Sequence, residues 1–275
     1  GIVALHAKKL GAQCCYLSVV GNDDEVDLLE EQLNLHEVNH VLLEDGSRPT
    51  TVKIRYLVDN QKLFRLSRLK EHGISKTIEE ALIQELRRQA PEVHGIIISD
   101  FVYGVITTRI LNEIIELAAR YQLLLFGDLQ CSSQVGNVSK FMNFDLICPT
   151  EREARIALGV HEEGVEWVAN TLMEKTGSKN LIMKLGAEGF IAYASGNDGY
   201  INRQHFPALN PNPVDLAGAG DSLIAALSVG ICAGSTLMQA SALGTVMASL
   251  AVQTIGNVPV TQHALHSILS TMNTN

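Results

Sequence analysis

The chain has 275 residues, of which 46% are hydrophobic, 19% charged and 5% aromatic. This length and composition suit one large α/β domain or two modest ones, and they exclude disordered and low-complexity proteins. The sequence carries 21 basic and 30 acidic residues, so its formal net charge is −9. An acidic protein is a poor non-specific ligand for nucleic acid or for an anionic membrane surface.

No apolar run approaches the roughly 20 residues that a membrane-spanning helix needs. The number of cysteines is odd, most of them lie in apolar segments, and no pair has CxxC spacing. This pattern predicts reduced core thiols and supports neither a disulfide framework nor a zinc site. We therefore expect a soluble, cytoplasmic protein. The cysteines are Cys14, Cys15, Cys131, Cys148 and Cys232.

Helix and strand periodicities alternate along most of the chain. The patterns predict helices over residues 2–10, 24–35, 81–90, 108–121 and 150–158. They predict strands over residues 15–20, 95–99, 123–127, 145–148 and 181–185. Alternation of this kind is typical of a mainly parallel sheet with crossover helices. Continuous apolar runs such as GIIIS at 95–99 indicate strands that are covered on both faces.

One region breaks the alternation. Residues 50–68 alternate apolar and polar side chains on both sides of an Asp-Asn pair, which predicts an antiparallel hairpin. Lys53 and Arg55 fall on the same face of its first arm. A hairpin with a basic face, inserted between α/β units, has the character of a lid over a site. The alternative is an ordinary edge hairpin whose basic face is solvated, and the pattern alone leaves both open.

The last third of the chain changes character. Three helices rich in small residues are predicted over residues 220–233, 237–254 and 261–272. Alanine, serine and glycine at such positions permit close helix packing. No internal repeat and no linker rich in proline, glycine or serine divides the chain, so we expect a single domain over residues 1–275.

The stretch VDLAGAGDSLIAAL at 214–227 contains the most informative candidate functional residues. Gly218, Ala219 and Gly220 are small enough for successive backbone N–H groups to converge on an anion, and the helix that follows adds its dipole. This is a phosphate-binding pattern. Asp221 stands beside it, where a carboxylate would repel phosphate, and this suggests a base that accepts the proton of an attacking hydroxyl. The alternative is that Asp221 only caps the helix.

Other functional motifs that contain glycine or histidine have little support in this sequence. The stretch GAGDSL lacks the third glycine of GxGxxG, which disfavours a dinucleotide-binding dehydrogenase, and no GxxxxGK[ST] occurs in the chain. No GxSxG or HExxH is present either. His36 and His40 are four residues apart but straddle the end of a predicted helix, which is typical of solvated loop histidines.

The sequence DLAGAGD at 215–221 resembles the DTxGAGD signature of the ribokinase-like (PfkB) carbohydrate kinases. Within that family, residues 49–66, 98–107 and 127–130 are most similar to the D-glycero-β-D-manno-heptose 7-phosphate kinase branch. The resemblance covers nearly the whole chain. It implies a ribokinase-like three-layer α/β sandwich with a mainly parallel sheet and a small β-hairpin lid at 48–68. It also implies ATP-dependent phosphorylation of a sugar hydroxyl, in the heptose branch from the 7-phosphate to the 1,7-bisphosphate.

The resemblance assigns roles to particular residues. Asp221 matches the catalytic base, and Gly218, Ala219 and Gly220 match the anion hole. Glu153 in PTERE matches the glutamate that helps to hold Mg²⁺ through water, although Thr150 and Glu153 also have the spacing of a helix capping box. The remaining matches are Lys184, Gly186, Gly189, Thr245 and Thr150 on the nucleotide side, and Lys53, Arg55, Gln61, Arg65 and Asp128 on the sugar-phosphate side.

Several positions depart from the family pattern. Ile2 stands where a sugar-binding Asn is usual, and the family's first strand, with its substrate-binding Asp, is absent from the sequence. Other residues of the family pattern are also replaced, at Ser67, Leu129, Gln130, Thr150, Ala217 and Thr245. The alternative to an active sugar kinase is therefore a kinase-fold protein with reduced or no catalysis that binds nucleotide or sugar or acts as a regulatory partner. By analogy with the family, the partners are a small sugar phosphate and, through the lid, a second copy of the chain.

Overall fold

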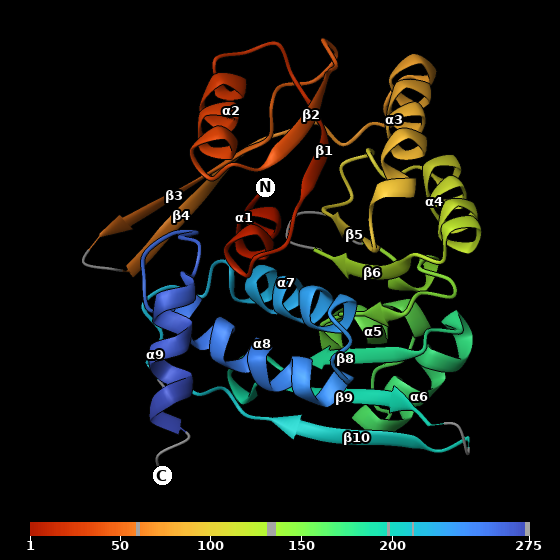
Figure 1. Ribbon diagram of the computed structural model, residues 1–275, viewed down its shortest axis with the longest axis vertical. Coiled ribbons are helices and arrows are strands. Elements are labelled where there is room, and N and C mark those ends of the chain that lie inside the picture. Colours follow the sequence, from red (N-terminus) through yellow and green to blue (C-terminus); the bar gives the residue numbers. More distant parts are fainter. Residues whose placement is uncertain (59–60, 131–135, 197–198, 211, 273–275) are drawn as a thin grey trace.

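A computed structural model describes residues 1–58, 61–130, 136–196, 199–210 and 212–272 (Figure 1). Its largest sheet has six strands in the order β10-β9-β8-β7-β6-β5. Neighbours from β5 to β8 are parallel, whereas β9 is antiparallel to both β8 and β10. The strands are β5 (Gly95–Asp100), β6 (Leu124–Leu129), β7 (Leu146–Ile147), β8 (Asn180–Lys184), β9 (Phe190–Ser195) and β10 (Ile201–Phe206).

Helices cover both faces of this sheet (Figure 1). Successive side chains of a strand point to opposite faces, and in β6 the Leu125 side chain packs into one core cluster and that of Phe126 into the other. Both faces of the sheet are therefore apolar and need a covering layer. The first cluster includes α3 (Lys76–Gln89), α4 (Thr108–Tyr121), α5 (Glu151–Leu158) and α6 (Val165–Thr176). The second includes α1 (Ile2–Lys9), α7 (Ala219–Cys232) and α8 (Leu237–Ala251), and α9 (Gln262–Met272) packs on α8. The predicted three-layer architecture is confirmed.

Small residues bring α7 and α8 together, as their composition predicted. A methyl group added at Gly244 would lie 2.6 Å from Leu223 Cδ1, and one at Gly230 would lie 3.1 Å from Ala240 Cβ. A side chain at Gly244 would require the Leu223 side chain to move, and one at Gly230 would press on Ala240. The close packing fixes α7, and with it Asp221, against the sheet.

A second, two-stranded parallel sheet is formed by β1 (Cys15–Val20) and β2 (Asn39–Glu44), which α2 (Glu25–Leu35) connects. Among the described strands, β1 therefore pairs only with β2, and β5 is the edge of the large sheet. Residues of β1 and β5 line the same cleft. The expectation that the family's first strand is absent from this sequence stays a prediction.

The inserted hairpin consists of β3 (Val52–Val58) and β4 (Gln61–Arg68), and it projects to the left in Figure 1. Its Asp-Asn turn, residues 59–60, lies outside the described residues. Tyr56 stacks on Phe64 across the strands with ring centroids 4.4 Å apart, and Ile54 pairs with Leu66 on the same face. These four side chains are 43–57% exposed. One face of the hairpin is thus an open apolar surface.

Several elements differ from the sequence expectations. Strands β2, β9 and β10 and helix α6 were not predicted, and β9 and β10 make the sheet mixed at one edge. Helix α3 begins at Lys76 rather than at residue 81, because the Ser75 hydroxyl accepts a hydrogen bond from the Ile78 N–H at 3.3 Å and caps it. Within the described ranges, no helix is both long and apolar enough to cross a membrane. Four of the cysteines are free thiols, and Cys131 lies outside the described residues.

Candidate active site

The glycine-rich loop before α7 has a strained entry that only glycine tolerates. Gly218 is the residue before the helix and has φ +85°, and a methyl group there would lie 2.6 Å from Asn257 Oδ1. The buried Asp215 carboxylate accepts hydrogen bonds from the N–H groups of Ala217 at 3.1 Å and Gly256 at 3.2 Å. These contacts fix the loop, so that the first turn of α7 lines the cleft with its backbone.

Asp221 belongs to that first turn, is 8% exposed and lines the cleft. The capping alternative is wrong, because Gly218 occupies the N-cap position of α7. The Asp221 Oδ1 atom instead accepts a hydrogen bond of 2.7 Å from the side-chain amide of Gln130. The same Gln130 nitrogen donates to Asp128 Oδ2 at 3.2 Å. The carboxylate is thus oriented by a neutral amide.

Lys184, the last residue of β8, brings a positive charge to this place. Its Nζ atom lies 2.7 Å from Asp128 Oδ1, and an added methyl group at Gly220 would be 3.8 Å away from it. Burial alone would lower the pKa of this ammonium, but the charges of Asp128 and Glu153 outweigh burial and raise the pKa. The lysine is therefore charged at neutral pH and stands beside the glycine turn.

Thr150 and Glu153 form the capping box that their spacing allowed. The Thr150 N–H donates to Glu153 Oε2 at 2.8 Å, and the Glu153 N–H donates to Thr150 Oγ1 at 3.2 Å. Glu153 is buried and lines the cleft. In the described part of the chain, no group of three or more His, Cys, Asp or Glu residues is arranged to hold a metal ion.

The other predicted nucleotide residues also line the cleft. Gly186 and Gly189 shape the turn after β8 with φ +65° and +88°, and a methyl group at Gly189 would lie 2.1 Å from the Phe206 carbonyl oxygen. Thr245 on α8 is buried and donates its hydroxyl to the Ser241 carbonyl at 2.9 Å. The helix backbone therefore already takes up this hydroxyl proton.

The basic face of the hairpin turns to the same cleft. Arg55 and Arg65 are directly opposite each other in the strand register, and both line the cleft with Lys53. Like charges in opposite positions of a hairpin repel each other, and an anion bound beside both would offset this repulsion. The Lys53 ammonium lies 4.2 Å from the centroid of the Phe101 ring and 5.3 Å from that of Tyr103. The side chain of Gln61 lies outside the described residues.

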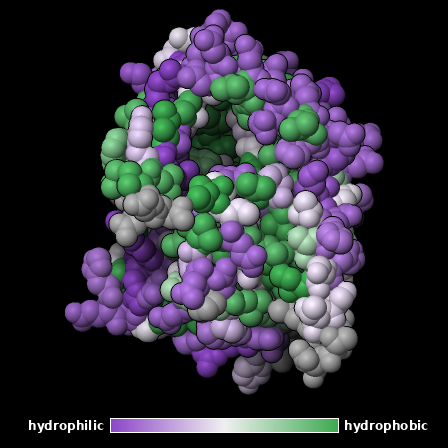
Figure 2. All heavy atoms as spheres, turned by 90° about the vertical axis from the view of Figure 1, so that its left-hand side faces the viewer, coloured by the Kyte–Doolittle hydropathy of each residue, from purple (hydrophilic) through white to green (hydrophobic). Residues whose placement is uncertain are grey.

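All these groups share one cleft of about 2280 Å³. Figure 2 shows the molecule from the side to which the hairpin projects, with a deep hollow that is hydrophobic inside and has both hydrophobic and hydrophilic residues around its rim. Ile2 lines the cleft with an apolar side chain where the family pattern has Asn. Sequence reasoning missed Phe101 and Tyr103, and treated Gln130 only as a substitution. Their signal was available, because each follows the carboxyl end of a parallel strand, where ligands of α/β sheets bind.

A glycine turn at a helix N-terminus, a carboxylate beside it and a cationic hairpin fit the binding of an anionic ligand and phosphoryl transfer to a hydroxyl group. The comparisons with known proteins agree. The chain belongs to the pfkB family of carbohydrate kinases, whose family model matches residues 3–263.

Curated relatives of the chain include two bacterial proteins named bifunctional protein HldE. That of Desulfatibacillum aliphaticivorans is 29% identical over 273 residues, which are 98% of this chain and 54% of the relative. That of Helicobacter hepaticus is 28% identical over 270 residues, which are 97% of this chain and 54% of the relative. The chain thus spans about half the length of the curated relatives it matches.

Solved structures of sugar kinases have the same fold. Phosphofructokinase-2 from Escherichia coli in complex with potassium matches with a TM-score of 0.79 at 15% identity, over 99% of this chain and 86% of that chain. Ribokinase from Giardia lamblia matches with a TM-score of 0.79 at 16% identity, over 97% of this chain and 87% of that chain. The ribokinase-like fold implied by the GAGD motif is confirmed.

Proposed function

We propose that the protein transfers the terminal phosphoryl group of ATP to a hydroxyl of a sugar phosphate, with Asp221 as the general base. The observation that carries this proposal is the position of Asp221. Its carboxylate lines the cleft in the first turn of α7, directly after the glycine turn, and the charged Lys184 lies close to Gly220. A base, N–H donors and a cation at one place are the parts that the reaction needs.

The chemistry follows from these residues. Asp221 accepts the proton of the attacking hydroxyl, whose oxygen forms a bond to phosphorus while the bond from phosphorus to the bridging oxygen of ATP breaks. The backbone N–H groups of Gly218, Ala219 and Gly220, together with the Lys184 ammonium, stabilise the charge on the transferred group. Gln130 keeps the carboxylate pointed at the cleft through its hydrogen bond.

We assign the nucleotide side to the residues after β8 and on α8, with Gly186 and Gly189 at the phosphates, Thr150 at the N-terminus of α5 and Thr245 near the base. Glu153 fits a magnesium ion, because Mg²⁺ is commonly held by one or two carboxylates together with substrate phosphates and water. When bound, the ion would offset the charge of the phosphates.

We infer that the sugar substrate is D-glycero-β-D-manno-heptose 7-phosphate and that the product is the 1,7-bisphosphate. The resemblance to the heptose branch supports this, as does the opposed pair of Arg55 and Arg65, which an anion would neutralise. Lys53, Gln61 and Asp128 complete the proposed sugar-phosphate side. The test is transfer from ATP, with Mg²⁺, to the heptose 7-phosphate compared with fructose 6-phosphate and ribose.

The second candidate is a non-catalytic protein of the same fold that binds nucleotide or sugar or regulates a partner. The apolar Ile2 at the cleft favours it, since a hydroxyl-binding amide is missing there. ATP binding without phosphoryl transfer to any of the three acceptors would favour this candidate over the kinase.

The lid arginines give a direct prediction about substrate binding. Arg55→Ala and Arg65→Ala should each raise the KM for the sugar phosphate roughly ten-fold or more, because each removes a charge-assisted contact to phosphate. The KM for ATP should change little, as should both KM values in Arg87→Ala, in which an exposed ion pair with Glu113 on another surface is lost. Initial-rate kinetics measure these effects. Equal effects on both substrates would contradict the lid assignment.

We further propose that the protein forms a homodimer through the hairpin. Ile54, Tyr56, Phe64 and Leu66 form an exposed apolar face, and a two-fold dimer would bury this face of one copy against the same face of the other. The wild type should therefore sediment as a dimer in sedimentation velocity, and Phe64→Lys should give a monomer. A monomeric wild type at micromolar concentration would show that this face has another use.

A further inference from the structure

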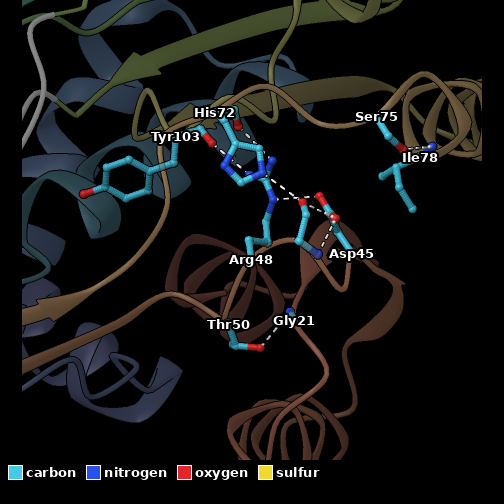
Figure 3. A network of polar contacts seen from close by, with 9 residues as sticks. Gly21, Asp45, Arg48, Thr50, His72, Ser75, Ile78 and Tyr103 are labelled. Atoms are coloured by element: carbon cyan, nitrogen blue, oxygen red, sulfur yellow. Dashed lines mark hydrogen bonds and ion pairs between the residues drawn. The ribbon is translucent and has the colours of Figure 1, made fainter.

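A buried arginine sits at the base of the hairpin, outside the groups used so far. The side chain of Arg48 is 5% exposed and makes three hydrogen bonds, which Figure 3 shows. Its Nε donates to Asp45 Oδ2 at 2.8 Å, its Nη1 to the Tyr103 carbonyl at 2.9 Å and its Nη2 to the His72 carbonyl at 2.8 Å. Each of the three nitrogens of the guanidinium thus has its own acceptor.

These acceptors lie on three different segments. Arg48 and Asp45 precede the hairpin, His72 follows it, and Tyr103 belongs to the loop after β5. One side chain therefore ties both ends of the lid to the loop beneath it. The charge of Arg48 is offset by that of Asp45. Burial alone would raise the pKa of Asp45, but hydrogen bonds from Ser47 and Arg48 outweigh burial and lower the pKa.

The loop after β5 is held in an unusual conformation. Val102 has φ +63°, which is rare for a β-branched residue, and its N–H donates to Asp100 Oδ1 at 2.8 Å. Gly104 has φ +81°, and a methyl group there would lie 2.2 Å from the His72 carbonyl oxygen. The loop and the segment that leaves the lid are thus in close backbone contact, and the Arg48 guanidinium bonds to both.

This loop also carries the aromatic platform under the lid. The rings of Phe101 and Tyr103 stack with centroids 5.9 Å apart, and the Lys53 ammonium lies over both. Lys53 is the second residue of β3 and lies five positions after Arg48. Whatever fixes the hairpin base relative to the loop therefore also fixes the lid cations relative to the cleft.

We propose that Arg48 is a positioning residue that sets the angle of the lid over the sugar-phosphate side of the cleft. This inference rests on the proposed function, in which the lid binds the sugar phosphate. Arg48 acts through Lys53, Arg55 and Arg65, because its own hydrogen bonds are all directed to Asp45, His72 and Tyr103. A lysine at this position keeps the charge next to Asp45 but lacks the planar fork that reaches three acceptors at once.

The test compares Arg48→Lys and Arg48→Met with Arg87→Met, a control that removes an arginine outside the lid, one that pairs with Glu113. Both Arg48 variants should raise the KM for the sugar phosphate roughly ten-fold or more, since small misplacement of binding groups is costly. The KM for ATP should stay within about two-fold. Deuterium uptake should rise in peptides from 48–68 and 100–107 of the free protein, and Arg87→Met should show neither change.

A lower melting temperature with both KM values unchanged would overturn the proposal, because Arg48 would then only stabilise the fold. Arg48→Lys keeps the test informative if Arg48→Met does not fold. If the wild type transfers no phosphoryl group, the proposed function fails. Deuterium uptake over 48–68 still tests whether Arg48 holds the lid in place. Unchanged uptake over 48–68 in Arg48→Lys would then overturn the role of Arg48 by itself.

Discussion

Replacing Asp221 by Asn is expected to lower kcat by about 10²- to 10⁴-fold, which is the usual contribution of a general base. The substitution keeps the size of the side chain and an oxygen that can accept the Gln130 hydrogen bond, but the amide cannot take the hydroxyl proton. The Kd for ATP should stay nearly unchanged or fall slightly, because a negative charge beside the phosphates is removed. Initial-rate kinetics and calorimetric titration with ATP measure the two effects.

The matched control is Asp27→Asn, which changes an exposed carboxylate on α2 away from the described cleft. It should leave kcat as in the wild type. A loss of less than ten-fold in Asp221→Asn, or an equal loss of ATP binding, would show that Asp221 does not act as the base. The glycine turn at Gly218 would then serve to bind a ligand without catalysing phosphoryl transfer.

The local part of this site was readable from the sequence. GAGD predicts its own geometry, because small residues and a helix N-terminus lie next to each other in the chain. The same holds for the capping box at Thr150 and Glu153, whose partners are three residues apart. Patterns of this kind need no knowledge of the sheet order.

The polar cluster around Asp221 could not be read in that way. Gln130 is 91 positions from Asp221, and Lys184 is 56 positions from Asp128. They meet because β6, β7 and β8 are adjacent parallel strands whose carboxyl ends share one edge of the sheet. The sequence predicted these strands but not their order, so the ion pair and the amide bridge stayed hidden.

The features that were not predicted differ in how much signal the sequence carries for them. Strand β10 is mostly exposed, and its polar sequence INRQHF gives no alternation to detect. Helix α6 did carry a signal, since Val165, Val168, Ala169, Leu172 and Met173 have helical spacing and four of them are buried. The positive φ of Val102 had no sequence signal, because valine is a residue that ordinarily avoids this conformation.

Replacing Lys184 by Met is expected to lower kcat by roughly 10²- to 10³-fold, comparable to the loss of a hydrogen-bond donor at a developing negative charge. The stretch DLQ at 128–130 lacks the lysine of the family's DPK pattern, and Lys184 brings an ammonium to the same cluster through its ion pair with Asp128. The variant should also be less stable by about 3–5 kcal/mol, because it leaves the buried Asp128 carboxylate without its partner.

The double variant Lys184→Met/Asp128→Asn separates these two roles. It removes both buried charges, so its free energy of unfolding should return toward that of the wild type. Its kcat should still lie roughly 10²-fold or more below that of Asp128→Asn alone, because the cation at the transferred phosphoryl group is missing. Denaturant unfolding and initial rates at saturating ATP and sugar phosphate measure the two quantities. If Lys184→Met has no further effect on kcat in the Asp128→Asn background, Lys184 serves only to neutralise Asp128.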